Sequence, residues 1–279
     1  MYTFPIHQSL PSFLIVLLFF TPATSSTEED NQRYSDCSPS PYDCGNVKLN
    51  ISYPFWTPGR PECCGYPKVF GITCNKADNS SEIEIQSRKY HVMQIEYEYQ
   101  TTTILDKAYF AIDDNTICLR PSSNTSLYLN LFSYTQRDLN LSFIYNCPLL
   151  PRYNEPYYNF FNCYSDPSSS NYTYFTLLPA ITELSTDCQV IKSPILEKNR
   201  EELEAWALGF EAWNDILKEG FEVTWSLIDP DHQCWDYVKS NGHCGLNQTY
   251  HHEFACYCNG IPHPETCPLP VFHDLIQAK

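Results

Sequence analysis

The chain has 279 residues and a net charge of −16, which excludes nucleic acid and anionic lipid head groups as general partners because both would be repelled. Glycine is sparse at 9 residues, whereas 21 prolines, 21 tyrosines and 16 phenylalanines favour short strands and loops over long helices. This length suffices for one large or two modest domains.

The first element is an apolar run, Phe13–Phe20, which ends at Thr21-Pro22 in a series of small residues. Such a run is too short to span a bilayer, but it is typical of a signal-peptide core, with Ala23 and Ser25 as the small residues before cleavage. We therefore expect residues 1–25 to be a signal peptide and the product to be secreted. No later stretch approaches the roughly 20 apolar residues of a membrane span.

All fourteen cysteines follow this leader. An even number of thiols in an oxidising compartment predicts a disulfide framework first, and metal or redox chemistry only second. The Cys256-x-Cys258 spacing fits a closed zinc site less well than the usual Cys-x₂₋₄-Cys, so we expect no metal and no cofactor. The predicted disulfide residues are Cys37, Cys44, Cys63, Cys64, Cys74, Cys118, Cys147, Cys163, Cys188, Cys234, Cys244, Cys256, Cys258 and Cys267.

The region from Cys44 to Cys147 has almost entirely the pattern of β-strands, separated by turn residues such as Pro58-Gly59. We therefore predict an antiparallel β domain over residues 37–147. The predicted strands are Val47–Tyr53, Val69–Cys74, Ile83–Gln86, Met93–Tyr99, Tyr109–Ile112, Leu127–Phe132 and Leu139–Asn146.

A connection rich in proline, tyrosine and serine over 148–170 predicts a domain boundary. Beyond it, Glu197–Glu219 carries large apolar residues at three- and four-residue spacing and ends at Gly220, which predicts one amphipathic helix facing the core. A smaller cysteine-rich domain then completes residues 148–267, and 268–279 form a tail. The predicted fold class is a mainly β, disulfide-rich secreted ectodomain with two domains.

Six Asn-x-Ser/Thr sequons indicate N-glycosylation of a secretory protein. In Val47–Tyr53 the apolar residues alternate with Lys48, Asn50 and Ser52, so these three side chains should point to solvent. Asn140 lies in the same kind of alternation. The six sequon asparagines are Asn50, Asn79, Asn124, Asn140, Asn171 and Asn247.

Two stretches resemble a known family. The first contains Cys37, Cys44-Gly45, Ile51-Ser52-Tyr53-Pro54-Phe55-Trp56, Arg60-Pro61-Glu62, Cys64-Gly65-Tyr66-Pro67 and Cys74. It resembles the galacturonan-binding domain of plant wall-associated and leaf-rust-resistance receptor-like kinases. The second contains Tyr145-Asn146-Cys147-Pro148, Gly220-Phe221-Glu222-Val223-Thr224-Trp225, Ser240-Asn241-Gly242-His243-Cys244-Gly245 and Phe254-Ala255-Cys256-Tyr257-Cys258-Asn259-Gly260. It is similar to the C-terminal domain that accompanies the first.

The resemblance implies an extracellular module that faces the plant cell wall and binds pectin. In that family a membrane span and a kinase domain normally follow, whereas this sequence ends at Lys279 without kinase signatures, so we expect no kinase activity. The cysteine pattern also departs from the family, since Tyr237 replaces an expected cysteine and Cys63 is additional. Nine cysteines up to Cys188 and five from Cys234 onward predict at least one bridge between the two regions if all are oxidised. We expect that bridge to involve Cys63 and the cysteine whose usual partner is replaced by Tyr237, unless Cys63 stays free.

A polygalacturonate ligand needs cations, and the window from Cys44 to Lys76 has four against one carboxylate, a net charge of +3. The region from Glu183 to Asp236 has four cations against 13 carboxylates, a net charge of −9. Arginine can pair bidentately with a uronate carboxylate, lysines supply point charges, and aromatic rings can pack on sugar C–H groups. The candidate binding residues are Lys48, Trp56, Arg60, Tyr66, Lys68 and Lys76.

Three alternatives stay open from the sequence. Calcium ions could bridge carboxylates of the protein and the polysaccharide. Trp56 could simply belong to the core. The disulfide scaffold could instead bind a protein or peptide, as a co-receptor or secreted decoy, with the acidic half attracting basic peptides. An enzyme is disfavoured, because Asp113-Asp114 cannot provide two carboxylates at a defined separation and His251-His252-Glu253 lacks the histidine spacing of a zinc protease.

Overall fold

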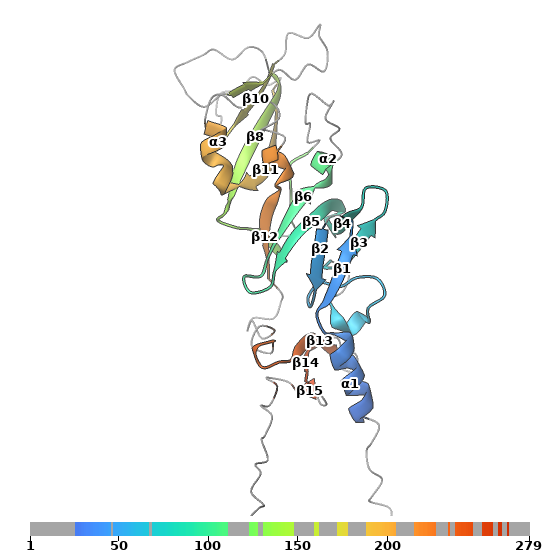
Figure 1. Ribbon diagram of the computed structural model, residues 1–279. Coiled ribbons are helices and arrows are strands. Elements are labelled where there is room, and N and C mark those ends of the chain that lie inside the picture. Colours follow the sequence, from blue (N-terminus) through green and yellow to red (C-terminus); the bar gives the residue numbers. More distant parts are fainter. Residues whose placement is uncertain are drawn as a thin grey trace, which may run out of the picture.

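The structure of the protein is a computed structural model. It describes residues 26–45, 47–66, 69–110, 123–127, 131–147, 159–161, 172–177, 188–204, 215–226, 234, 238–247, 253–258, 262–263 and 267. The described strands form a central six-stranded sheet with a four-stranded sheet at one end and a three-stranded sheet at the other (Figure 1). A two-stranded hairpin lies beside the central sheet.

The central sheet has the order β3-β4-β5-β6-β12-β7, and every neighbouring pair is antiparallel. Its strands are β3 (Ile72–Asn75), β4 (Ser80–Ile85), β5 (Arg88–Glu96), β6 (Thr101–Asp106), β12 (Phe221–Trp225) and β7 (Phe132–Tyr134). The hairpin β1 (Ser40–Cys44) and β2 (Val47–Ile51) contributes Leu49 and Ile51 to the core on one face of this sheet.

The four-stranded sheet has the order β11-β8-β10-β9, and its core also contains Leu105 on β6. Its strands are β11 (Gln189–Leu196), β8 (Asp138–Cys147), β10 (Tyr172–Thr176) and β9 (Asn159–Phe161). Ile104 and its neighbour Leu105, on β6, belong to separate cores, as side chains of successive strand residues should. The central sheet is therefore covered on both faces at β6.

The three-stranded sheet consists of β13 (His243–Asn247), β14 (Glu253–Tyr257) and β15 (Pro262–His263). Helix α1 (Ser26–Asp36) and the 3₁₀ turn η2 (Glu62–Cys64) pack against it. Successive side chains of β14 point to opposite faces and so belong to two small clusters of buried residues. Cys256 lies with Cys258 and Cys267 on one face, whereas Tyr257 lies with Cys63 on the other.

The mainly β, disulfide-rich fold class is confirmed, but individual elements differ from the prediction. The polar stretch Ser26–Asp36 is helix α1, which the sequence did not predict. Residues Tyr109 and Phe110 belong to the short helix α2 (Lys107–Phe110) and not to a strand. Strand β6 was missed because Thr101–Asp106 is nearly all buried and so lacks polar and apolar alternation.

The predicted helix over Glu197–Glu219 is described only at its two ends. The first part is the 3₁₀ turn η3 (Glu197–Asn199) followed by α3 (Arg200–Glu204), and residues 215–218 are helical before Gly220. Leu203 and Leu217 are buried in the core shared with β8, as the spacing predicts. The remaining predicted apolar positions, 206–213, lie outside the described residues.

The predicted boundary after residue 147 does not separate two sheets. Strand β12, from the second half of the sequence, pairs with β6 and β7 of the first half. Strand β8, from the first half, pairs with β10 and β11 of the second. Strands from both sides of residues 148–170 therefore share the same two sheets.

Ten of the cysteines are joined in five disulfides, and two described cysteines are free. The bonds are Cys37–Cys64, Cys44–Cys74, Cys147–Cys188, Cys234–Cys244 and Cys258–Cys267. None of these five crosses from the region ending at Cys188 to the region starting at Cys234. Cys118 and Cys163 lie outside the described residues.

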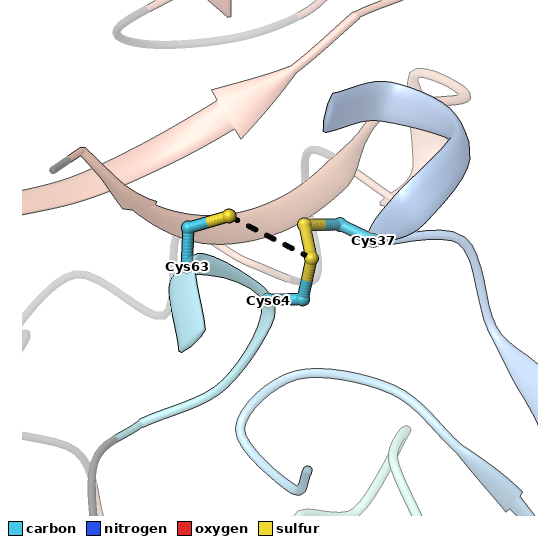
Figure 2. A group of neighbouring side chains, drawn as sticks. All are labelled: Cys37, Cys63 and Cys64. Atoms are coloured by element: carbon cyan, nitrogen blue, oxygen red, sulfur yellow. Dashed lines mark hydrogen bonds between the residues drawn. A yellow bond between two sulfur atoms is a disulfide. The ribbon is translucent and has the colours of Figure 1, made fainter. Parts of the chain in front are cut away.

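The free cysteines, Cys63 and Cys256, correct the expectation that all fourteen are bridged. Cys64 forms its disulfide with Cys37, and the Cys63 thiol lies 3.9 Å from the Cys64 sulfur, a hydrogen-bond contact that Figure 2 shows as a dashed line. Cys256 faces the opposite side of β14 from Cys63. The two leftover thiols therefore cannot reach one another across the strand, and the expected bridge between the regions does not form from them.

Candidate functional site

The Cys44–Cys74 disulfide brings two of the predicted lysines to one end of the central sheet. It joins the end of β1 to β3 with a Cα–Cα distance of 5.6 Å. Gly45, at φ +74°, packs so closely that a Cβ atom there would lie 2.4 Å from the carbonyl oxygen of Asn79. The β1–β2 turn therefore rests on the β3–β4 turn. We call the ends of β1, β2 and β3 around this disulfide the disulfide edge.

Lys48 and Lys76 are the exposed cations of the disulfide edge. The Lys48 side chain is 83% exposed, and its nearest carboxylate, Asp43 on the opposite strand, is 3.9 Å away. An exposed pair at this distance is weak and leaves the ammonium open to a ligand. Lys76, two residues after Cys74, is also exposed. The third predicted lysine, Lys68, lies outside the described residues.

Arg60 is placed as a structural residue rather than a ligand-binding one. Its Nη1 donates to the carbonyl oxygen of Ile51 at 2.8 Å, and its Nη2 donates to those of Asp36 and Ser38 at 2.8 and 2.6 Å. Burial lowers the pKa of Arg60, but a guanidinium remains charged. Since the guanidinium donates to three backbone carbonyls, it ties α1 and the residues before β1 to β2 and has little capacity left for a uronate.

Trp56 and Tyr66 are half-buried and pack inside the first core. A Cβ atom on Gly65 would lie 2.5 Å from the Cβ of Trp56, so the Cys-Gly step of the motif makes room for the tryptophan. Tyr66 packs edge-on against Phe70 with ring centroids 5.8 Å apart. Both residues pack against the core, which favours the core interpretation of Trp56.

Other cations of the central sheet are bound to carboxylates. Lys107 donates to Glu82 and lies 3.0 Å from Asp78, and Lys89 lies 3.1 Å from Glu82. Burial alone would raise the pKa of Glu82, but the hydrogen bonds from Lys107, Asn75 and Lys89 and the charge of Lys107 together hold it below its usual value. These ammonium groups stabilise a buried carboxylate and are not available for a polyanion.

A pocket of about 130 Å³ lies at the other end of β2. It is lined by Pro39, Asn50, Ser52, Tyr53, Pro54, Tyr97, Gln100, Trp225, Cys234 and Val238, none of which is charged. The hydroxyl of Tyr97 accepts a hydrogen bond from the backbone N–H of Ser52 at 2.8 Å and donates to the carbonyl oxygen of Asn50 at 2.9 Å. These two bonds hold the phenol ring beneath the end of β2.

The pocket was not found from the sequence, because its walls come from distant segments. The exposed alternation of Asn50 and Ser52 was visible, but nothing in the pattern places Tyr97 and Trp225 beside them. Trp225 lies there because β12 pairs with β6, and its backbone N–H donates to the carbonyl oxygen of Gln100 at 3.0 Å.

Comparison with known proteins divides the chain into two modules, to which the disulfide edge and the pocket can be assigned. Residues 37–106 match the family model described as wall-associated receptor kinase galacturonan-binding, and residues 162–261 match the one described as wall-associated receptor kinase C-terminal. The chain belongs to the family of proteins built on these two modules. The disulfide edge lies entirely in the galacturonan-binding module, whereas the pocket takes Tyr97 from that module and Trp225 from the C-terminal one.

Relatives with both regions include receptor-like kinases of Arabidopsis thaliana. Leaf rust 10 disease-resistance locus receptor-like protein kinase-like 2.1 is 28% identical over 93% of this chain, and the match covers 39% of that kinase. The 2.4 member of the same series is 31% identical over 91% of this chain, and 38% of it is covered. The chain thus spans less than half the length of these relatives. No solved structure matches.

Neither matching family model describes a kinase domain. Among the described residues, no helix is both long enough and apolar enough to cross a membrane.

Proposed function

We propose that this protein is a non-catalytic, secreted ectodomain that senses the plant cell wall by binding pectin, with de-esterified polygalacturonate as its ligand. The observation that carries the proposal is the match of residues 37–106 to a galacturonan-binding module in which two exposed lysines gather at the disulfide edge. The signal peptide and the glycosylated state are parts of the same proposal.

The proposed contact is between uronate carboxylates and the ammonium groups of Lys48 and Lys76. Arg60, Trp56 and Tyr66 would hold the module together and would not touch the polymer. Each exposed lysine contributes a modest, salt-sensitive attraction. A polymer that offers many carboxylates can engage several weak contacts at once, so its overall affinity exceeds that of a single contact.

A pull-down on immobilised polygalacturonate tests the proposal. The wild-type protein should bind at low salt, be released at high salt and be indifferent to a calcium chelator. The double variant Lys48→Glu, Lys76→Glu should lose binding. The matched control is Lys192→Glu, a charge reversal at an exposed position on β11, far from the disulfide edge in the fold.

Other outcomes have distinct meanings. If a calcium chelator releases the protein and high salt does not, the contact is a calcium bridge and not a lysine–carboxylate pair. Equal loss in the double variant and in Lys192→Glu would indicate an effect of overall charge, and so refute the assigned edge. No binding of the wild type to polygalacturonate would contradict the polysaccharide function. A protein or peptide ligand would then be the function to test.

A further inference from the structure

The sequon Asn50-Ile51-Ser52 opens directly onto the uncharged pocket. Both of its polar residues, Asn50 and Ser52, line the pocket, while Ile51 between them is fully buried in the core. Asn50 is exposed. A glycan joined to the Asn50 amide would therefore begin at the rim of the pocket.

The chemistry of the pocket suits the first sugar of such a glycan. That sugar is an N-acetylhexosamine, which is neutral and has an apolar C–H face and an acetyl methyl group. The partly exposed ring of Tyr97 lines the pocket, and aromatic groups pack well against C–H groups; Tyr53 and Trp225, buried in the cores, complete the aromatic wall behind it. Gln100 also lines the pocket, and an amide side chain can bond a sugar hydroxyl or acetamide.

Covalent attachment removes most of the cost of binding. A sugar tethered at the rim has a high effective concentration at the pocket, so even weak packing is enough to keep it there. A free ligand of the same chemistry would have to offset the loss of its translational freedom.

We propose that the first N-acetylglucosamine of an N-linked glycan on Asn50 occupies this pocket and closes the junction between the two modules. The glycan is then a structural part of the fold at this position. Its first sugar joins β2 and the β5–β6 turn of the galacturonan-binding module to Trp225 and Val238 of the C-terminal module.

This arrangement also affects the outward face of β2. Lys48 lies two residues before Asn50 on the same exposed face, about 7 Å away along the strand. Lys48 does not line the pocket. A sugar directed into the pocket is held beyond Asn50 on the side away from Lys48, which leaves that lysine open. The inference rests on the glycosylated state proposed above but does not depend on pectin binding.

The chain provides an internal control. Asn140 is also an exposed sequon asparagine within a strand, β8, but it does not line this pocket. A glycan on Asn140 should therefore be freely accessible under native conditions.

The test is the rate at which a peptide N-glycosidase removes each glycan from the folded, full-length glycoprotein, produced with high-mannose glycans and followed by peptide mass. A sugar that is docked ten times more often than it is free should be released about tenfold more slowly at Asn50 than at Asn140. Unfolding the protein should equalise the two rates. The variant Val238→Trp, which fills the pocket from its exposed rim, should speed release at Asn50 and leave Asn140 unchanged.

A second measurement does not rely on any variant. In an NMR spectrum of the glycoprotein, the acetyl methyl of the Asn50-linked sugar should be shifted by the rings of Tyr97 and Trp225, unlike that of the Asn140-linked sugar. The inference would be overturned if Asn50 carried no glycan, if the two native release rates were equal, or if release at Asn50 stayed slow in Val238→Trp. None of these results bears on the polygalacturonate pull-down.

Discussion

Substituting Arg60 should damage the fold rather than a binding surface. The guanidinium makes three charge-assisted hydrogen bonds, to the carbonyl oxygens of Asp36, Ser38 and Ile51. Such bonds contribute about 1.5–3 kcal/mol each when buried, and less here because Arg60 is only half-buried. We therefore expect Arg60→Ala to lower the free energy of unfolding by about 3 kcal/mol.

Arg60→Lys should not rescue the fold. Lysine keeps the charge, but a single ammonium cannot reach two directions as the planar guanidinium does, so we expect a loss of about 2 kcal/mol. Lys48→Ala is the control, with a change within about 0.5 kcal/mol because its side chain is exposed.

Urea unfolding followed by tryptophan fluorescence measures these differences, and a polygalacturonate pull-down of the protein that remains folded separates stability from binding. The assignment of Arg60 is refuted if Arg60→Ala is as stable as Lys48→Ala but no longer binds the polymer. In that case Arg60 would be a ligand contact, as its place in the basic window first suggested.

Three further changes test other parts of the account. Gly65→Ala should cost about 1–3 kcal/mol of stability in a thermal or urea melt, because its Cβ would overlap Trp56, and unchanged stability would contradict that packing. Cys256 should resist alkylation in the native protein at neutral pH and react after unfolding, since it is fully buried and burial raises its pKa to about 11; peptide mapping that finds it alkylated natively or in a disulfide would contradict this. Lys107→Met should destabilise the protein most near neutral pH. The stability that the ion pair gives through Glu82 is present above the ordinary glutamate pKa of about 4.3 and is lost as the pH falls through the lower folded value, so the difference from wild type should shrink in acid unfolding curves.

The elements that the sequence predicts well are those with one exposed face. In β2, Leu49 and Ile51 are buried while Lys48 and Asn50 are exposed, as the alternation indicates. Strand β6 has no such alternation because both of its faces are covered, one by each core. Burial on two faces removes the pattern on which a prediction from sequence depends.

The candidate site was predicted only in part, because a sequence shows charges but not the contacts that they make. Charge counting along the chain found Lys48 and Lys76, and the Cys44–Cys74 bond then explains why they lie at one edge. The same counting could not separate them from Arg60, since a charge in a sequence does not reveal that its donors are bonded to backbone carbonyls. The walls of the pocket depend on the pairing of β12 with β6, which is a contact across more than a hundred residues.

The central claim is that exposed lysines at the disulfide edge bind the carboxylates of polygalacturonate. Isothermal titration with de-esterified oligogalacturonate and with the fully methyl-esterified form tests it most directly, because esterification removes the carboxylate charges and leaves the sugar chain unchanged. We predict binding of the de-esterified form alone, with an affinity that falls as salt rises and is lost in Lys48→Glu, Lys76→Glu. Equal affinity for both forms, or unchanged affinity in the double variant, would contradict the claim.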